Sequence, residues 1–117
     1  MRMMSDCLFC KIQSGEMKAG IVFESDDVVA FEDINPQAPT HVLVIPRKHI
    51  PSIDEIEAED AEVVGKLFLA AKEIARERGL HEKGYRVVMN MGPDAGQVVY
   101  HIHLHLVGGR RLSWPPG

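Results

Sequence analysis

Three histidines alternate with apolar residues near the C-terminus, in Tyr100-His101-Ile102-His103-Leu104-His105-Leu106. Successive side chains along a strand point to opposite faces. The three imidazoles would therefore share one face, and the apolar side chains the other, which we expect to pack on a helix. A row of histidines is too polar for a core and too weakly charged for a merely solvated surface, so the pattern predicts chemistry.

Two kinds of chemistry suit such a face. Histidines two residues apart on a strand can ligate one zinc ion whose open position activates a water. Alternatively, one neutral imidazole is a nucleophile, and its neighbours orient phosphate oxygens or donate a proton. Gly96 and Gln97, in the loop that enters this strand, favour the second interpretation because backbone N–H groups there could contact a phosphate.

Length and charge exclude several other functions. The 117 residues suit one domain, and the net charge of −4 argues against a nucleic acid strand as partner. No stretch approaches the roughly 20 apolar residues needed to span a bilayer. The first residues lack the apolar centre of a signal peptide. We therefore expect a cytoplasmic protein that binds no membrane.

Cys7 and Cys10 are the two cysteines and form a CxxC pair. A reducing cytosol disfavours a structural disulfide between them. Metal binding, redox chemistry and no special role all remain open from this spacing alone.

The elements that must position these residues follow from hydrophobic periodicity and turn residues. A short helix is expected from Asp6 to about Ser14. Ser52 and Glu55 have capping-box spacing, which predicts a long helix that runs to Arg78. Its apolar stripe comprises Ala61, Val64, Leu67, Phe68, Ala71, Ile74 and Ala75. Strands are expected over 21–23, 28–31, 41–45, 85–90 and 99–107, which gives an α+β domain with a mostly antiparallel sheet.

The histidine segment resembles the signature of the histidine-triad family, in which three histidines alternate with apolar residues. Four further segments are similar to the Hint branch of that family, which contains nucleoside phosphoramidases: 31–41, 44–50, 84–90 and the closing Trp114-Pro115-Pro116-Gly117. The resemblance covers Asp6 to Gly117. It implies a single domain over 1–117 with a five-stranded sheet, flexible residues 1–5, and a homodimer whose sheet continues across subunits, with the tail 108–117 at the interface.

The resemblance also implies roles for individual histidines. His103 would be the nucleophile that attacks the α-phosphorus and forms a nucleotidyl-histidine, which water then hydrolyses. His105 would contact the phosphate and the leaving group, and His41 would support the cluster. The nucleophile needs its Nδ1–H held by an acceptor, which in this family is a backbone carbonyl of the same strand. No metal or other cofactor takes part in this chemistry.

A purine mononucleotide is the ligand that the resemblance implies. Asp33 would accept the ribose hydroxyls, since a carboxylate offers two acceptor oxygens, and Trp114 would reach the active site of the partner subunit. The remaining contacts are the apolar walls around the base and the groups beside the phosphate: Leu8, Phe9, Ile12, Phe31, Ile34 and Leu43 for the walls, and Asn90, Gly96, Gln97, Val98 and Val99 for the phosphate side.

Val98 departs from the pattern, because the Hint branch usually has serine or threonine after Gly-Gln. A side-chain hydroxyl donor is therefore missing, while the backbone N–H remains. Loss of one hydrogen bond to a charged group typically costs about 1.5–3 kcal/mol. We expect weaker binding or an altered substrate preference, with the reaction class unchanged.

Zinc is the metal that the resemblance implies, because some triad-family members hold a structural zinc with two cysteines and two histidines. The ligands here would be Cys7, Cys10, His49 and His101. His81 lies in a charged segment and is expected at the surface. The pairs Arg47-Lys48 and Arg110-Arg111 are expected to be solvated, although the second could touch a leaving group.

The leading hypothesis is thus a hydrolase of purine nucleoside 5′-phosphoramidates or related nucleotidyl-amines. A dinucleoside-polyphosphate hydrolase or nucleotidyl transferase could use the same histidine. A nucleotide-sensing scaffold with incidental catalysis belongs to a different class, and a catalytic zinc held by all three histidines is a further alternative.

Overall fold

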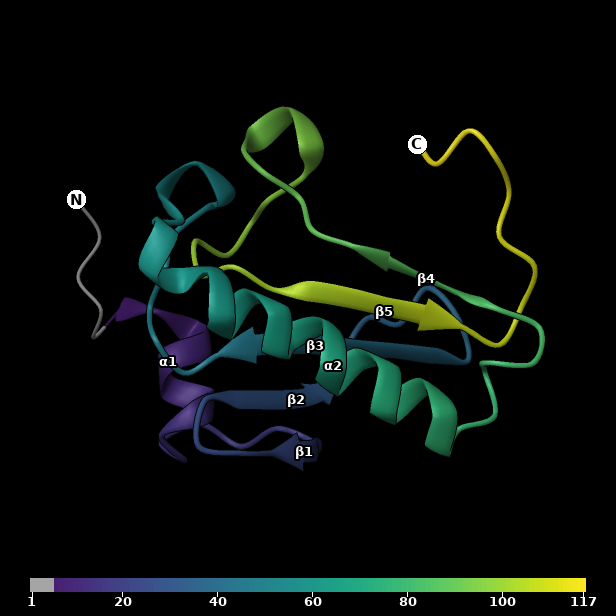
Figure 1. Ribbon diagram of the computed structural model, residues 1–117, viewed down its shortest axis with the longest axis horizontal. Helices are drawn as coiled ribbons and strands as arrows, with labels where there is room; N and C mark the ends of the chain where they lie inside the picture. The colour runs from purple at the N-terminus through teal and green to yellow at the C-terminus, as the bar shows by residue number, and fades with distance from the viewer. Residues whose placement is uncertain (1–5) are drawn as a thin grey trace.

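A computed structural model describes residues 6–117; residues 1–5, expected to be flexible, lie outside this range. Within it, the strands form one sheet in the order β1-β2-β3-β5-β4 (Figure 1). Their bounds are Ile21–Glu24 for β1, Val28–Glu32 for β2, Thr40–Pro46 for β3, Tyr85–Val88 for β4 and Leu104–Gly108 for β5. All four neighbouring pairs are antiparallel. The expected α+β class with a five-stranded antiparallel sheet is confirmed.

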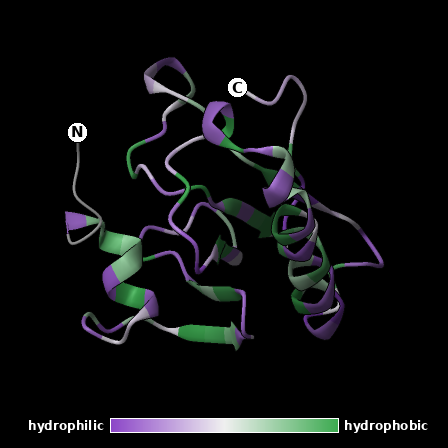
Figure 2. Cartoon of the chain, turned by 60° about the vertical axis from the view of Figure 1, so that its left-hand side comes forward, coloured by the Kyte–Doolittle hydropathy of each residue, from purple (hydrophilic) through white to green (hydrophobic). Residues whose placement is uncertain are grey.

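Each face of this sheet packs on a different helix. The long helix α2 (Ala61–Glu77) covers one face, and the short helix α1 (Leu8–Gln13) covers the other. In Figure 2 the two helices lie on opposite sides of the molecule. The strands alternate accordingly, with the following residues toward α2: Val28, Ala30, Val42, Val44, Leu104 and Leu106. The intervening residues of β2 and β3 face α1: Val29, Phe31, Leu43 and Ile45.

The central strand β3 shows this two-sided burial most fully, since all seven of its residues are buried. His41 is in register with Val107 on β5, and Leu43 with His105. Because alternate residues share a face, His41 and His105 belong to the α1 face. The α2 face is left mainly to aliphatic packing, and the histidines of β3 and β5 lie on the other side.

The long helix begins later than the sequence predicts. Ser52 precedes only a 3₁₀ turn over Ile53–Glu55, which ends at Glu55. A second 3₁₀ turn over Ala58–Asp60 then precedes α2. The break follows from the contacts of Asp60, whose carboxylate is held by two partners before the helix begins. Its Oδ2 accepts the N–H of Glu57 at 2.9 Å, and its Oδ1 accepts Lys48 Nζ at 2.6 Å. This ion pair also ties the segment after β3 to the start of α2.

The stripe of α2 is also partly different from the prediction. Leu67, Ala71, Ile74 and Ala75 are buried as expected, and Ala70 joins them. Phe68, by contrast, is 52% exposed. Two adjacent residues lie about 100° apart around a helix, so Phe68 turns outward when Leu67 points into the core. In Figure 2, α2 carries hydrophobic and hydrophilic residues along opposite stripes.

The last strand is shorter than the predicted 99–107. Only Leu104–Gly108 pairs in the sheet, and residues 98–103 lead into it without strand pairing. Its neighbour β3 ends at Pro46, which has no N–H to continue the ladder. Ile102 instead donates its N–H to Ile50 O at 2.8 Å. The strict alternation nevertheless persists, since Ile102 packs on the α2 side with Leu104 and Leu106.

No helix within residues 6–117 combines the length and apolar character needed to cross a membrane.

Truncation of Leu67 to alanine is expected to lower the free energy of unfolding by about 2–5 kcal/mol, because its side chain is fully buried against the sheet. Leu69→Ala is the matched control. It removes the same atoms from a side chain that is 62% exposed, and it should cost less than about 1 kcal/mol. Urea denaturation of both variants measures the difference, and equal losses would contradict this assignment of the core.

Candidate active site and metal centre

The ring of His103 is held in one tautomer by the backbone. Its Nδ1 lies 2.8 Å from the carbonyl oxygen of His101, and a carbonyl can only accept, so Nδ1 carries the proton. The Nε2 atom of a neutral His103 is then left with a free lone pair. This is the acceptor that the family resemblance implies, although the residues involved precede the strand rather than lie in it.

His41 and His105 form a second hydrogen-bonded unit. The N–H of Gln37 donates to His41 Nδ1 at 3.0 Å, so the proton of a neutral His41 must be on Nε2. That Nε2 lies 2.9 Å from His105 Nδ1 and 3.3 Å from Asp33 Oδ2. His105 Nδ1 therefore accepts, and His105 keeps its own proton on Nε2. The backbone of Gln37 thus sets the direction of every hydrogen bond in this unit.

Burial favours the neutral form of the imidazoles of His101, His103 and His105. Desolvation lowers the pKa of His103, and it lowers the pKa of His105 to about 4, with the nearby His103 and His41 acting in the same direction. Burial likewise lowers the pKa of His101 to about 4. A neutral imidazole has one donor and one acceptor nitrogen. The chemistry of the cluster therefore depends on which nitrogen carries the proton.

Aromatic side chains wall the histidines on the α1 side. Phe9 stands edge-on to His103, with ring centroids 5.0 Å apart, and to Phe31 at 5.4 Å. His103 and His105 are themselves neighbours, with centroids 4.9 Å apart. Of the predicted nucleotide contacts, the following belong to or pack against this apolar cluster: Phe9, Ile12, Phe31, Leu43 and Val99.

The loop before the histidines uses most of its polar groups internally. The N–H of Gly96 donates to Pro93 O, and the N–H of Gln97 donates to Gly92 O. The buried side chain of Gln97 accepts from Gly92 N and donates to Pro51 O and Val99 O. Gln97 therefore shapes the loop, and its N–H is not free for a ligand in this conformation. Val98 follows with a side chain that is 81% exposed.

Two other predicted contacts have largely exposed side chains in the single chain. Ile34 is 100% exposed and Trp114 is 81% exposed. Leu8 is partly exposed, and Asn90 is half-buried after β4. Asp33 is better placed, because its Oδ1 accepts the N–H of Asn35 at 2.8 Å while Oδ2 faces His41.

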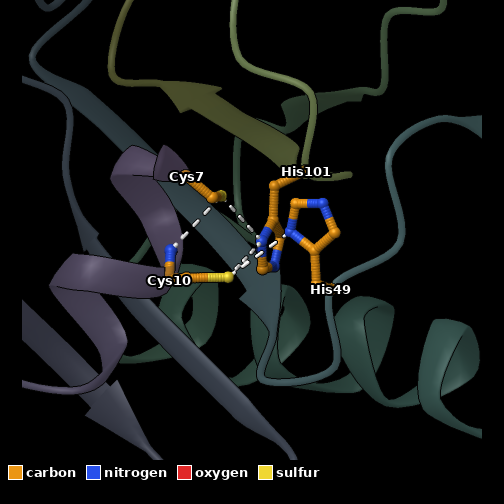
Figure 3. A group of neighbouring side chains, drawn as sticks. All are labelled: Cys7, Cys10, His49 and His101. Atoms are coloured by element: carbon orange, nitrogen blue, oxygen red, sulfur yellow. Dashed lines mark hydrogen bonds between the residues drawn. The ribbon is translucent and has the colours of Figure 1, made fainter. Parts of the chain in front are cut away.

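A separate cluster joins three distant segments. Cys7 and Cys10 come from the start of α1, His49 from the segment after β3, and His101 from the segment before β5 (Figure 3). The Sγ atoms of Cys7 and Cys10 lie 3.4 and 3.5 Å from His101 Nδ1, and Cys10 Sγ lies 3.4 Å from His49 Nδ1. Both imidazoles thus point a nitrogen at the thiols, and the four predicted ligands are brought together.

The hydrogen bonds of His101 suit a metal ligand. Its Nε2 lies 2.7 Å from Pro46 O and must donate to it, so the lone pair is on Nδ1, toward the thiols. A metal-binding histidine commonly donates its other N–H to a carbonyl in this way. Burial, together with the neighbouring Cys7, raises the pKa of the Cys10 thiol to about 11. A bound cation would offset this by favouring the thiolate.

A second group of potential ligands, Asp33, His41 and His105, is less suited to a metal. Gln37 N–H occupies the Nδ1 lone pair of His41, so the nitrogen that faces the group carries the proton. Ligation there would require an imidazolate. His103 belongs to neither group within the described residues, so the three histidines do not converge on one metal position, contrary to the three-histidine alternative.

Sequence reasoning missed the backbone groups that fix these rings, namely the carbonyl of Pro46 and the N–H of Gln37. The sequence gives one signal for the Pro46 carbonyl, because a proline has no N–H and ends the strand pairing there. The second depends on how the 33–39 loop folds back, and no residue type there signals it.

The HIT domain family profile matches residues 14–112. The 14 kDa zinc-binding protein of Zea mays is 48% identical over 115 residues, which cover 97% of this chain and 89% of that protein. Among solved structures, the HIT family hydrolase of Legionella pneumophila is 53% identical with a TM-score of 0.94, covering 96% of this chain and all of that one. The histidine triad nucleotide-binding protein of Candida albicans is 32% identical with a TM-score of 0.80, covering 94% and 83%.

The antiparallel sheet, the two flanking helices and the backbone-held histidines define a triad-type domain. With a profile match over most of its length, this chain belongs to the HIT family.

Proposed function

We propose that this protein hydrolyses purine nucleoside 5′-phosphoramidates, or related nucleotidyl-amines, through a covalent intermediate on His103. The observation that carries the proposal is the 2.8 Å contact between His103 Nδ1 and His101 O. It leaves the lone pair of the neutral ring on Nε2, and a neutral imidazole needs no strong base to act as a nucleophile.

The reaction would take two displacements at phosphorus. In the first, His103 Nε2 forms a bond to the α-phosphorus, the phosphorus–nitrogen bond to the amine breaks, and the amine leaves after taking a proton from solvent. In the second, water attacks the phosphorus and the bond to Nε2 breaks, so the electron pair returns to His103 and a proton goes to solvent. His105, with its proton on Nε2, would donate a hydrogen bond to a phosphate oxygen or the leaving group.

The relatives support a nucleotide substrate. The Legionella protein is described as a hydrolase, and the Candida protein as nucleotide-binding. In this chain, Phe9 and Phe31 would pack near the nucleoside, and the Asp33 carboxylate retains acceptor capacity for ribose hydroxyls beside its bonds to Asn35 N–H and His41. The alternative, a dinucleoside-polyphosphate hydrolase or transferase, would use the same histidine with a different leaving group.

His103→Ala is expected to lower kcat by about a thousandfold or more, because it removes the covalent route. The variant should still bind AMP. Mass spectrometry of rapidly quenched reactions should find a nucleotidyl adduct in the wild type and none in this variant. A panel of phosphoramidates and dinucleoside polyphosphates identifies the leaving group.

His81→Ala is the matched control, since His81 is exposed and distant in sequence from the cluster. It should retain full activity. Full activity of His103→Ala would overturn the proposal. Tight AMP binding with negligible turnover of every substrate by the wild type would favour the scaffold alternative.

We also propose that Cys7, Cys10, His49 and His101 hold a structural zinc ion. Such an ion would supply no reaction chemistry and would cross-link three segments of the chain. The donor set supports this, because two thiols and two correctly oriented imidazoles match a tetrahedral zinc shell. The Zea mays relative is named a zinc-binding protein.

Elemental analysis should find about one zinc per wild-type chain and a loss of it in Cys7→Ser/Cys10→Ser. His49→Ala should weaken retention against a chelator, whereas His81→Ala should not. The melting temperature of the wild type should fall after chelation, because a bound metal stabilises the folded state. Zinc that survives removal of both thiols would contradict this site.

A homodimer through the β4 edge is the third part of the proposal. β4 lies at the end of the sheet order and, within residues 6–117, pairs with one strand. An exposed strand edge is a template for pairing with another chain. The exposed Trp114 would then be available to a partner.

Light scattering at micromolar concentration is expected to give twice the chain mass of 13.0 kDa. A mass of one chain across the accessible concentrations would sink the dimer and leave the catalytic proposal standing.

A further inference from the structure

Arg110 contacts the loop that controls the tautomer of His41. Its Nε donates to the carbonyl of Gln37 at 3.0 Å, and its Nη1 donates to the carbonyl of Arg111 at 2.9 Å, so the guanidinium is anchored at two points. Gln37 is also the residue whose N–H donates to His41 Nδ1. One residue of the loop therefore connects Arg110 on one side to the histidine pair on the other.

The neighbouring Gly109 packs closely against the same loop. It adopts a φ of +93°, a conformation that favours glycine. A Cβ at this position would lie 2.9 Å from Cβ of Pro39, closer than the two residues could tolerate. The turn after β5 thus lies directly against the 33–39 loop. Because β5 also carries His105, this turn links the strand of one histidine to the loop that sets the other.

We propose that Arg110 is a positioning residue for the reaction, which holds Gln37 so that its N–H keeps the proton of His41 on Nε2. The inference rests on the proposed function for its catalytic consequence, whereas the tautomer itself can be observed without any substrate. The effect is one of orientation. The carbonyl and the N–H of Gln37 belong to different peptide units, so Arg110 fixes the residue rather than polarising the hydrogen bond directly.

A change of tautomer at His41 would reverse the hydrogen bond between His41 and His105. If Gln37 moves and His41 takes its proton on Nδ1, its Nε2 presents a lone pair to both Asp33 Oδ2 and His105 Nδ1. His105 must then carry its proton on Nδ1 to restore the 2.9 Å contact. Its Nε2 would face the phosphate as an acceptor, opposite the oxygens that it should stabilise. One displaced loop residue would thus remove the donor from the reaction.

Arg111 is the matched control. Both arginines line the same cleft of about 530 Å³ beside residues 79–84, and both are exposed. Of the two arginines, only Arg110 donates a side-chain hydrogen bond to the 33–39 loop within the described residues. If the positive charge alone matters, Arg110→Ala and Arg111→Ala should both lower activity. If the hydrogen bond to Gln37 matters, only Arg110→Ala should do so.

The test combines imidazole ¹⁵N NMR with steady-state kinetics on Arg110→Ala, Arg110→Lys and Arg111→Ala. In Arg110→Ala, we expect His41 Nδ1 to become partly protonated and kcat to fall about tenfold, with KM changed less than about twofold. Arg110→Lys should recover part of both, because an ammonium can donate to the same carbonyl. Arg111→Ala should match the wild type.

Wild-type imidazole signals in Arg110→Ala would overturn the positioning role, whatever its turnover. An equal loss of kcat in Arg111→Ala would do the same, by assigning the effect to charge. If the wild type itself cleaves none of the substrates, the proposed function fails, and the NMR comparison still decides the role of Arg110.

Discussion

The hydrogen bond between His103 Nδ1 and the carbonyl of His101 is the contact on which the site depends. It requires the His101 backbone to stay fixed, and three interactions fix it. The His101 side chain donates to Pro46 O, the next N–H binds Ile50 O, and Nδ1 faces two thiols. The metal-type cluster and the candidate nucleophile are therefore joined through a single residue, so ordering of one supports ordering of the other.

The two-sided sheet explains how such a polar cluster fits into a small domain. The core between α2 and strands β2, β3 and β5 is aliphatic, with Val42, Val44 and Leu106 fully buried. That face supplies the stability. The opposite face is then free to carry His41 and His105 between Phe9 and the 33–39 loop, at the desolvation cost seen in the lowered pKa of His105.

The sequence predicts the sheet and both helices from hydrophobic periodicity and turn residues. The four ligand residues of the metal-type cluster follow only from the family resemblance, because the spacing of Cys7 and Cys10 alone leaves their role open. The sequence misplaces the start of α2, since Asp60 binds Lys48, which is distant in sequence. The sequence wrongly predicts that the last strand begins at residue 99, because its alternating pattern does not reveal that the partner strand β3 ends at Pro46. Phe68 fits the apolar stripe by type but turns outward, because Leu67 and Ala71 take the inward positions.

The tautomers are least predictable from sequence, because they depend on main-chain groups. Burial lowers the pKa of His101, His103 and His105, so each ring is neutral and has one donor. Each neutral imidazole can donate from either nitrogen, so the rings alone do not determine which one donates in each hydrogen bond. A group that can only donate or only accept must determine it. Here a carbonyl orients His101, another carbonyl orients His103, and an N–H orients His41, which in turn orients His105. Backbone N–H groups always donate and carbonyl groups always accept, so the fold sets the direction of these hydrogen bonds. The loops that present these groups are therefore as much a part of the site as the histidines.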